Sequence, residues 1–482
     1  MLTIPCTIVL LICTVVCVRH VRNLDYRFGE FAFFSSFGLI FGLAPIMQSS
    51  DSYVNIFSMD SRVKAAWYTV AGVLLLMVGF GLIRQPLWQL IPKKRALLKK
   101  ISEPHVQRML ANIFWLSIAI TISGQLLVMY AKGISLLDIL YSGRFAFRFE
   151  NQGVLTVLAS HLMSFVYAPA FIGVFLNRRY QLLTLAYVPI ASGVFFFVFS
   201  KGTRSIPLAL IVTLLVAGSI RFKVSPKRVA MTAIVGLVSL ALAIGLFELR
   251  QRQDSVSLLE GAKILCTATA YSGMWDRDPL SYSWNLVGAI ETFPHSHPYL
   301  DAATYRRMLV FFLQESKFPD LKPPDTNIIF GLEVHGRPEE LQVTVPPSIL
   351  GDIYINFWGW YGLPVVVLHG MRYCWLLQRM QTSLFMFIWV GPLSGRFLVL
   401  IHRGEPYEMF VLFVMFFFEM AGVYSFCKLV ASGTQRRRRT STMRNPSKRL
   451  PVARPYLKHQ PSGYLSTRSG NSRPFRPGKG TL

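Results

Sequence analysis

The feature that most constrains this chain is a series of eleven apolar stretches, each close to the length of a membrane-spanning helix. Residues 229–247 carry no charge and are long enough to cross a hydrocarbon core, which needs about 20 residues of helix. Hydrocarbon offers no partner to unpaired backbone groups, so we expect helices as the spanning elements. The predicted spans are 2–18, 31–50, 65–83, 109–131, 154–176, 180–200, 206–220, 229–247, 353–371, 382–401 and 409–430.

Composition agrees with an all-α polytopic integral membrane protein. The chain is 52% hydrophobic and 15% charged, against about 25% charged in ordinary soluble domains. Its net charge of +26 would suggest nucleic acid in a soluble protein, but much of that charge lies in the basic segment 431–482. This segment is rich in Ser, Pro and Gly, so we expect a disordered cytoplasmic tail that touches anionic lipid. RNA binding is the weaker alternative, and we expect no nucleic-acid partner.

One interruption of the apolar pattern, residues 249–350, is far longer than the others. It divides the chain into eight predicted spans in 1–248, a large extracytoplasmic loop, three spans in 351–430 and the tail 431–482. Cys266 is the only cysteine of the loop, so the loop cannot form an internal disulfide. The six cysteines show no metal-ligand spacing, and we expect neither a metal nor a cofactor.

The charges of the short loops predict the orientation. Lys and Arg are enriched in alternate loops, and such loops face the cytoplasm. The enriched set lies near 19–27, 84–108, 178–179, 221–228 and 372–379, followed by the tail. With eleven spans, the N-terminus and the large loop are expected outside and the C-terminus in the cytoplasm.

The first candidate segment on the outer side contains Arg144 and Arg148, which lie four residues apart and would share one face of a helix. Two guanidinium groups on one face can bind a diphosphate bidentately. The alternative is an interfacial turn whose arginines reach lipid phosphates.

The second segment is the short connection Ser200-Lys201-Gly202-Thr203-Arg204-Ser205 between two apolar stretches. A helix is expected to start near Ser205, with Pro207 in its first turn. A helix N-terminus beside Lys201 and Arg204 is suited to binding an anion. A plain turn with two lipid-facing bases is the alternative.

The third segment runs from the large loop into the ninth predicted span. Prolines 346 and 347 end any preceding helix, and Ser348 is a candidate N-cap for the span. Asp352, Tyr354 and Asn356 would then lie in the first helical turns. The Asp352 carboxylate is a candidate base or arginine partner, or else a favourable charge on the helix N-terminus.

These segments resemble the oligosaccharide repeat-unit polymerases, the Wzy-type or O-antigen polymerases of bacterial surface polysaccharide synthesis. The resemblance rests on S-K-G-T-R-S at 200–205 and on P-P-S-I-L-G-D-I-Y-I-N-F-W-G-W-Y-G at 346–362. Asp352 stands where the family usually has Glu, which keeps the carboxylate. Trp358 stands where Gly is usual, which puts close backbone packing there in doubt. The shared layout covers most of residues 1–430.

The resemblance implies a membrane glycosyltransferase with a GT-C-like architecture. Such an enzyme moves a glycan from one polyprenyl (undecaprenyl) diphosphate to the repeat unit on another, at the outer face of the bacterial cytoplasmic membrane. Fixed cations would stabilise the diphosphate leaving group, and a base would activate the acceptor hydroxyl. The expected catalytic residues are Asp352, Arg204 and His335, with His297 as a further base. The expected substrate-binding residues are Arg144, Arg148, Lys201, Arg306, Arg307, Tyr354 and Asn356.

The expected partners are the polyprenyl-diphosphate-linked oligosaccharide, membrane lipid and, by resemblance, a chain-length regulator and a flippase for O-antigen or exopolysaccharide. Aromatic stretches within 271–299 suit stacking against sugars. Three alternatives stay open: an O-antigen ligase, which delivers the glycan to a different acceptor; a lipid-linked-sugar flippase; and a structural membrane scaffold. Flippases tend to place charges within the helix bundle, whereas most charges here lie near the outer rim.

Overall fold

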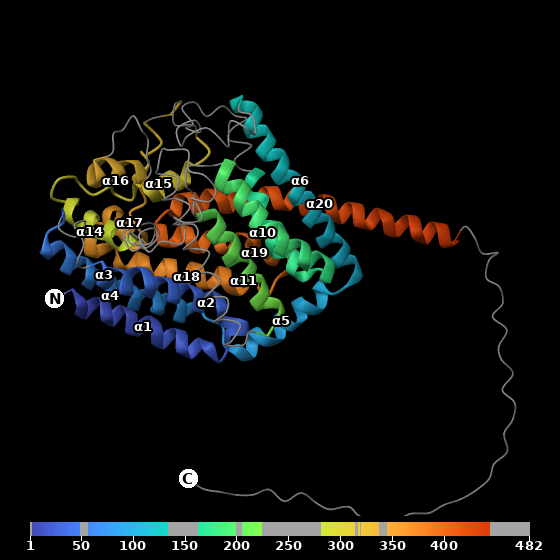
Figure 1. Cartoon of the computed structure of the whole chain (residues 1–482), viewed down its shortest axis with the longest axis horizontal. Coiled ribbons are helices and arrows are strands. Elements are labelled where there is room, and N and C mark those ends of the chain that lie inside the picture. Colours follow the sequence, from blue (N-terminus) through green and yellow to red (C-terminus); the bar gives the residue numbers. More distant parts are fainter. Residues whose placement is uncertain are drawn as a thin grey trace, which may run out of the picture. The chain divides into compact units, whose positions relative to one another are not determined.

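The computed structural model describes residues 2–48, 56–133, 162–198, 205–223, 281–313, 317–318, 320–336 and 345–443. Within these ranges every regular element is helical (Figure 1). Six helices are long and apolar enough to cross a membrane: Thr3–Val21, Leu24–Met47, Met59–Ile83, Pro104–Leu127, Leu384–Arg403 and Pro406–Val430. The described part is therefore an α-helical, multi-pass membrane protein. The predicted span 229–247 lies outside the described residues, and the number eleven stays a prediction.

The described residues form a series of α-helices. In chain order they are α1 (Thr3–Val21), α2 (Leu24–Phe37), α3 (Ala44–Met47), α4 (Met59–Ile83), α5 (Leu87–Ile101), α6 (Pro104–Lys132), α9 (Tyr167–Ile172), α10 (Arg178–Val198), α11 (Ser205–Arg221), α14 (Tyr282–Thr292), α15 (Ala303–Leu309), α16 (Thr326–His335), α17 (Ile349–Asn356), α18 (Leu363–Arg379), α19 (Leu384–Arg403) and α20 (Pro406–Met443). A π-helical turn, Gly38–Leu43, joins α2 to α3.

Two expectations about helix boundaries are wrong. The ninth predicted span, 353–371, is not one helix, because α17 ends at Asn356 and α18 begins at Leu363. Trp358 and Gly359 between them adopt positive φ values of 51° and 69°, which break the helical path. The tail was expected to be disordered from residue 431, yet α20 continues to Met443. Arginine and glutamine favour helix there, and residues 444–482 lie outside the described part.

Close packing of α4 against α18 depends on two glycines. A Cβ added at Gly79 of α4 would lie 2.3 Å from the carbonyl oxygen of Val367, and one at Gly370 of α18 would lie 2.7 Å from that of Leu76. Small residues at facing positions allow membrane helices to approach in this way. Because α17 leads directly into α18, this contact positions the helix that carries Asp352.

We predict that Gly79→Leu destabilises the protein while Gly81→Leu does not. A Cβ at Gly81, two residues away on the same helix, meets nothing within 4 Å. Overpacking at Gly79 should cost about 1–3 kcal/mol. Thermal denaturation of the detergent-purified variants, followed by size-exclusion chromatography, measures the difference. Equal midpoints for the two variants would show that the α4–α18 approach contributes nothing.

The basic loops assigned to one side by the charge bias meet in the structure. Lys94 of α5 donates to the carbonyl oxygens of Asp25, at the start of α2, and of Ser219, near the end of α11. Arg27 donates to the carbonyl oxygen of Gln85, whose own N–H donates to Gln378 of α18 over 3.0 Å. The helix α5 lies apart from α14–α17 in Figure 1. Loops that share a membrane side must gather in this way, and the direction of that side stays a prediction.

We expect reporter fusions at residues 300 and 445 to report opposite compartments, with residue 300 outside the cytoplasm. The prediction follows from the positive-inside rule applied to the short loops. A periplasmic phosphatase and a cytoplasmic fluorescent protein serve as the two reporters. Cytoplasmic signals at both positions would contradict the predicted orientation and move the large loop to the inner face.

Candidate functional site

The site begins where α17 starts against the turn between α19 and α20. The Ser348 hydroxyl accepts a hydrogen bond from the N–H of Gly351, which confirms Ser348 as a helix N-cap. The Ser348 N–H donates to the carbonyl oxygen of Arg403 over 2.9 Å. A Cβ at Gly404 would lie 2.0 Å from the carbonyl oxygen of Ser348, so only glycine permits this approach. The start of α17 and the α19–α20 turn are therefore fixed together.

Asp352, in the first turn of α17, is the centre of a buried polar network. Its side chain is 1% exposed and accepts hydrogen bonds from Thr304 Oγ1 (3.0 Å), Asn356 Nδ2 (3.1 Å) and Tyr305 Oη (3.4 Å). Thr304 and Tyr305 belong to α15 of the large loop, whereas Asn356 lies one turn along α17. The carboxyl group thus holds the large loop against the membrane helices.

Backbone groups strengthen the same junction. The N–H of Thr304 donates to Asn356 Oδ1 (3.1 Å), and the N–H of Ala302 donates to the carbonyl oxygen of Asn356 (2.7 Å). Thr304 Oγ1 lies 2.6 Å from Thr326 Oγ1 at the start of α16. Asn356 therefore uses both its side chain and its backbone to hold α15.

A second branch of the network runs into α18. Tyr305 Oη lies 2.8 Å from His369 Nε2, so the phenol joins the Asp352 carboxyl to an imidazole of α18. Burial raises the pKa of the Tyr305 hydroxyl well above its usual range, and Arg372, one turn beyond His369 on α18, opposes part of the rise. The charge pattern had placed Arg372 in an inner loop, but it lies in the middle of α18, which ends at Arg379.

Two cavities of about 220 Å³ each adjoin Asp352. Asp352, Gly404, Glu405 and Pro406 line both. One is completed by Thr304, Arg307, Asp325, Thr326, Asn327 and Tyr407. The other is completed by Ile349, His369, Ile401 and Met409.

Two carboxyl groups on the cavity walls, those of Asp352 and Glu405, have raised pKa values, and both lie outside the candidate spans. Burial raises the pKa of Asp352 to about 7, and the hydrogen bonds from Thr304 and Tyr305 oppose part of the rise. Burial likewise raises the pKa of Glu405 to about 7, although Arg403, whose Nε lies 2.8 Å from Glu405 Oε2, opposes it. Both groups can exchange a proton near neutral pH.

The arginines of α15 separate into a buried and an exposed one. Arg307 is 7% exposed, donates to the carbonyl oxygen of Pro323 and lies 5.1 Å above the ring of Tyr407. Arg306 is exposed. Only Arg307 of the two lines a cavity at Asp352, which gives the two predicted binding residues different surroundings.

The other predicted residues are placed as follows. Arg144, Arg148, Lys201 and Arg204 lie outside the described residues. His335 ends α16 beside Phe330, and it lines neither cavity at Asp352. Tyr354 packs edge-on against Tyr68 and Tyr299, and His297 hydrogen-bonds the adjacent Pro298 carbonyl oxygen over 2.7 Å. Of the predicted set, the structure brings together Asp352, Asn356 and Arg307.

Sequence reasoning missed Thr304, Tyr305, His369 and Glu405. Signals for them exist: Thr304 and Tyr305 directly precede the arginines already singled out. His369 is a polar residue in an apolar helix, which usually marks an interior contact. Glu405 follows a glycine in the connection between two apolar helices. Near the same turn, Arg396 of α19 pairs with Glu408 of α20.

The chemical capacity of the site is acid–base and electrostatic. Within the described ranges no three His, Cys, Asp or Glu residues are arranged to hold a metal ion. Asp352 and Glu405 can accept or donate protons, Arg307 places positive charge on one cavity wall, and Arg403 pairs with Glu405. Comparison of the chain with protein-family models, curated proteins and solved structures found no match.

We predict that Asp352→Asn changes how stability depends on pH. The pKa of Asp352 is raised from 3.8 to about 7, so between these values the folded protein keeps a proton that the unfolded chain loses. Wild-type stability should therefore fall as pH rises from 4 to 8, by up to about 4 kcal/mol from this group. The Asn variant should lack that component.

Thermal denaturation at pH 4, 6 and 8 in detergent tests this prediction. The midpoint of Asp352→Asn should rise relative to that of the wild type as pH increases. Asp320→Asn, at an exposed position of the large loop, is the matched control and should follow the wild type. A constant difference between Asp352→Asn and the wild type across pH would contradict the prediction.

Proposed function

We propose that the protein polymerises polyprenyl-diphosphate-linked oligosaccharide repeat units at the outer face of the bacterial cytoplasmic membrane. The observation that carries the proposal is the buried Asp352 carboxyl, held between the large loop and the membrane helices with a pKa raised to about 7. A lipid-linked sugar places its reacting bond at this kind of junction, because its polyprenyl chain stays in the bilayer while its glycan reaches the loop.

Asp352 acts as the base in this proposal. The acceptor hydroxyl transfers its proton to the carboxylate as its oxygen bonds to the anomeric carbon of the donor glycan. The bond from that carbon to the donor diphosphate breaks, and polyprenyl diphosphate leaves. A base with a pKa near the working pH is the most effective in such a step. Tyr305 donates a hydrogen bond that orients the carboxyl, and His369 in turn holds the Tyr305 hydroxyl.

Arg307 supplies the positive charge on the described side of the site. The leaving diphosphate gains negative charge as the glycosidic bond breaks, and fixed cations stabilise that charge more than they stabilise the bound donor. Arg307 is held in place by the Pro323 carbonyl oxygen and the Tyr407 ring. Arg144, Arg148, Lys201 and Arg204 are proposed as further diphosphate contacts from the segments named above.

Glu405 is proposed as a second proton carrier. It lines both cavities with Asp352, and its burial raises its pKa to about 7. Once Asp352 has taken the acceptor proton, a neighbouring carboxyl of similar affinity can receive a proton and restore the base. The ion pair with Arg403 keeps the Glu405 side chain beside the cavity.

The test is the surface glycan of a strain that lacks the chain and is complemented with variants. Asp352→Asn should lose 10²-fold or more in polymerisation rate, on the order expected for a general base, and give no ladder of long glycans. Asp352→Glu, with the residue usual in the resembling family, should retain a substantial part of the ladder. Arg307→Gln should shorten or abolish the ladder, while the matched control Arg306→Gln keeps it.

Membrane levels of each variant are measured on the same samples by immunoblot. A wild-type ladder from Asp352→Asn at normal protein level would remove Asp352 from the mechanism. Addition of one block of glycan with no change in ladder length would instead favour the ligase reaction over polymerisation.

A further inference from the structure

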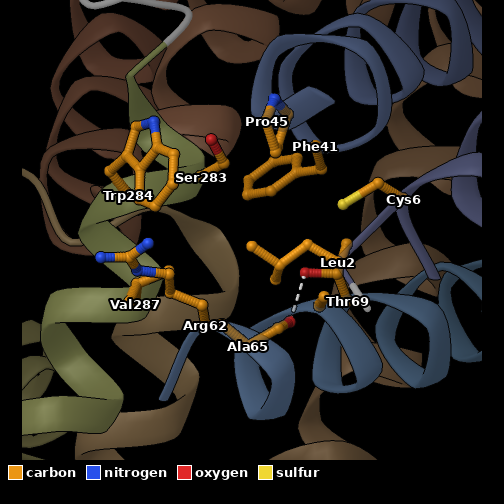
Figure 2. A pocket seen from close by; sticks show the side chains of 11 residues that line it. Leu2, Cys6, Phe41, Pro45, Arg62, Ala65, Thr69, Ser283, Trp284 and Val287 are labelled. Carbon is orange, nitrogen blue, oxygen red and sulfur yellow. Dashed lines mark hydrogen bonds between the residues drawn. The ribbon is translucent and has the colours of Figure 1, made fainter. Parts of the chain in front are cut away.

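A third cavity lies between α1, α4 and α14, and none of its lining residues lines the two cavities at Asp352. It contains about 360 Å³ of empty space. Its lining residues are Leu2, Cys6, Phe41, Pro45, Arg62, Ala65, Ala66, Thr69, Ser283, Trp284 and Val287. Figure 2 shows Arg62 on the side of Trp284, with Leu2 and Cys6 across the cavity from them. Most of the wall is apolar, and Arg62 is its only charged residue.

The cavity lies at one end of two candidate membrane spans. Leu2 and Cys6 belong to the beginning of the candidate span Thr3–Val21, and Arg62 lies in the first turn of the candidate span Met59–Ile83. Ile4 and Met59, at the same ends of these helices, are 65% and 55% exposed. Large exposed apolar side chains on membrane helices face lipid, so lipid has access to this end of α1 and α4.

Three buried polar atoms in or beside the cavity have no hydrogen-bond partner in the part of the chain that the structure describes. They are Arg62 Nε, Ser283 Oγ and Gln48 Nε2. Ser283 is 8% exposed, and Gln48, which is fully buried, binds the Trp284 indole N–H through its other amide atom. Buried polar groups are nearly always satisfied, so these three require a ligand or water. All three can donate, so the missing partner carries acceptor oxygens.

The charge of Arg62 has no ion-pair partner among the described residues. Its guanidinium donates to the carbonyl oxygen of Phe57 over 2.6 Å, and no described carboxylate lies within 4 Å of it. Lys64, two residues along α4, differs because it pairs with Asp60 at 2.6 Å. Glu291, the nearest acid on α14, is bound by the hydroxyl of Ser58 at 2.7 Å. Arg62 therefore favours an anionic ligand.

We propose that this cavity binds an anionic glycerophospholipid of the surrounding bilayer. The phosphate lies at Arg62 and Ser283, and one acyl chain enters between Leu2, Phe41 and Val287. A free phosphate would satisfy the polar atoms and leave the apolar wall uncovered, whereas a neutral lipid would leave the Arg62 charge unbalanced. None of the residues that carry this proposal carries the glycan chemistry proposed at Asp352.

The test measures lipid binding to the full-length, detergent-purified protein by native mass spectrometry and by thermal stabilisation. Phosphatidylglycerol should bind about tenfold more tightly than phosphatidylcholine of the same chain length. Only phosphatidylglycerol carries a net negative charge, which balances the charge of Arg62. Arg62→Gln should remove that preference. Lys64→Gln, at the exposed and paired lysine of the same helix, should keep it.

Further arms distinguish the source of the phosphate and test the apolar wall. Ala65→Leu, which fills the cavity, should weaken the binding of both lipids, provided that the variant elutes as a single species in size-exclusion chromatography. Inorganic phosphate at the same concentration should not displace phosphatidylglycerol. Equal phosphatidylglycerol binding by Arg62→Gln and the wild type would overturn the proposal. So would full competition by phosphate alone, or binding restricted to a polyprenyl phosphate.

Discussion

The buried carboxyl of Asp352 is the constraint on which the junction between α15 and α17 depends. Its hydrogen bonds come from α15 of the large loop and from α17, so one side chain joins the two helices. A carboxyl group removed from water is stable only when such partners surround it. The positions of Thr304, Tyr305 and Asn356 follow from this requirement, and so does the raised pKa that makes the group chemically useful.

Glycine decides the rest of the site. Because Gly404 permits the α19–α20 turn to approach the backbone of Ser348, Glu405 is brought beside Asp352 from a part of the chain more than fifty residues away in sequence. The close contact of α4 and α18 through Gly79 and Gly370 fixes the other side of α17 by way of α18. Asp352 and Glu405, whose affinities for a proton are similar, are thus held in place by packing elsewhere in the fold.

The sequence allowed the local features to be predicted and left the long-range ones out of reach. Ser348 as N-cap and Asp352 in the following turn are confirmed, because capping depends on neighbours three residues apart. The pairing of Tyr305 with His369 joins residues 64 positions apart, and no periodicity encodes it. The break at Trp358 was missed for a different reason. Mean hydropathy is an average over a whole apolar stretch. The helical path is broken, however, by the positive φ of Trp358, whose indole N–H donates a hydrogen bond to Asp301.

The helix α14 connects the two sites described here. Ser283 and Trp284 of this helix line the cavity beside Arg62. The next residue, Asn285, donates a hydrogen bond to the carbonyl oxygen of Pro346 over 2.6 Å. Pro346 immediately precedes Pro347 and the Ser348 cap of α17. A lipid that holds α14 against α1 and α4 therefore also holds the segment from which Asp352 projects. A site of the kind proposed at Asp352 acts only when its geometry is maintained, so the proposed lipid beside α14 would be a physical means of setting the proposed activity.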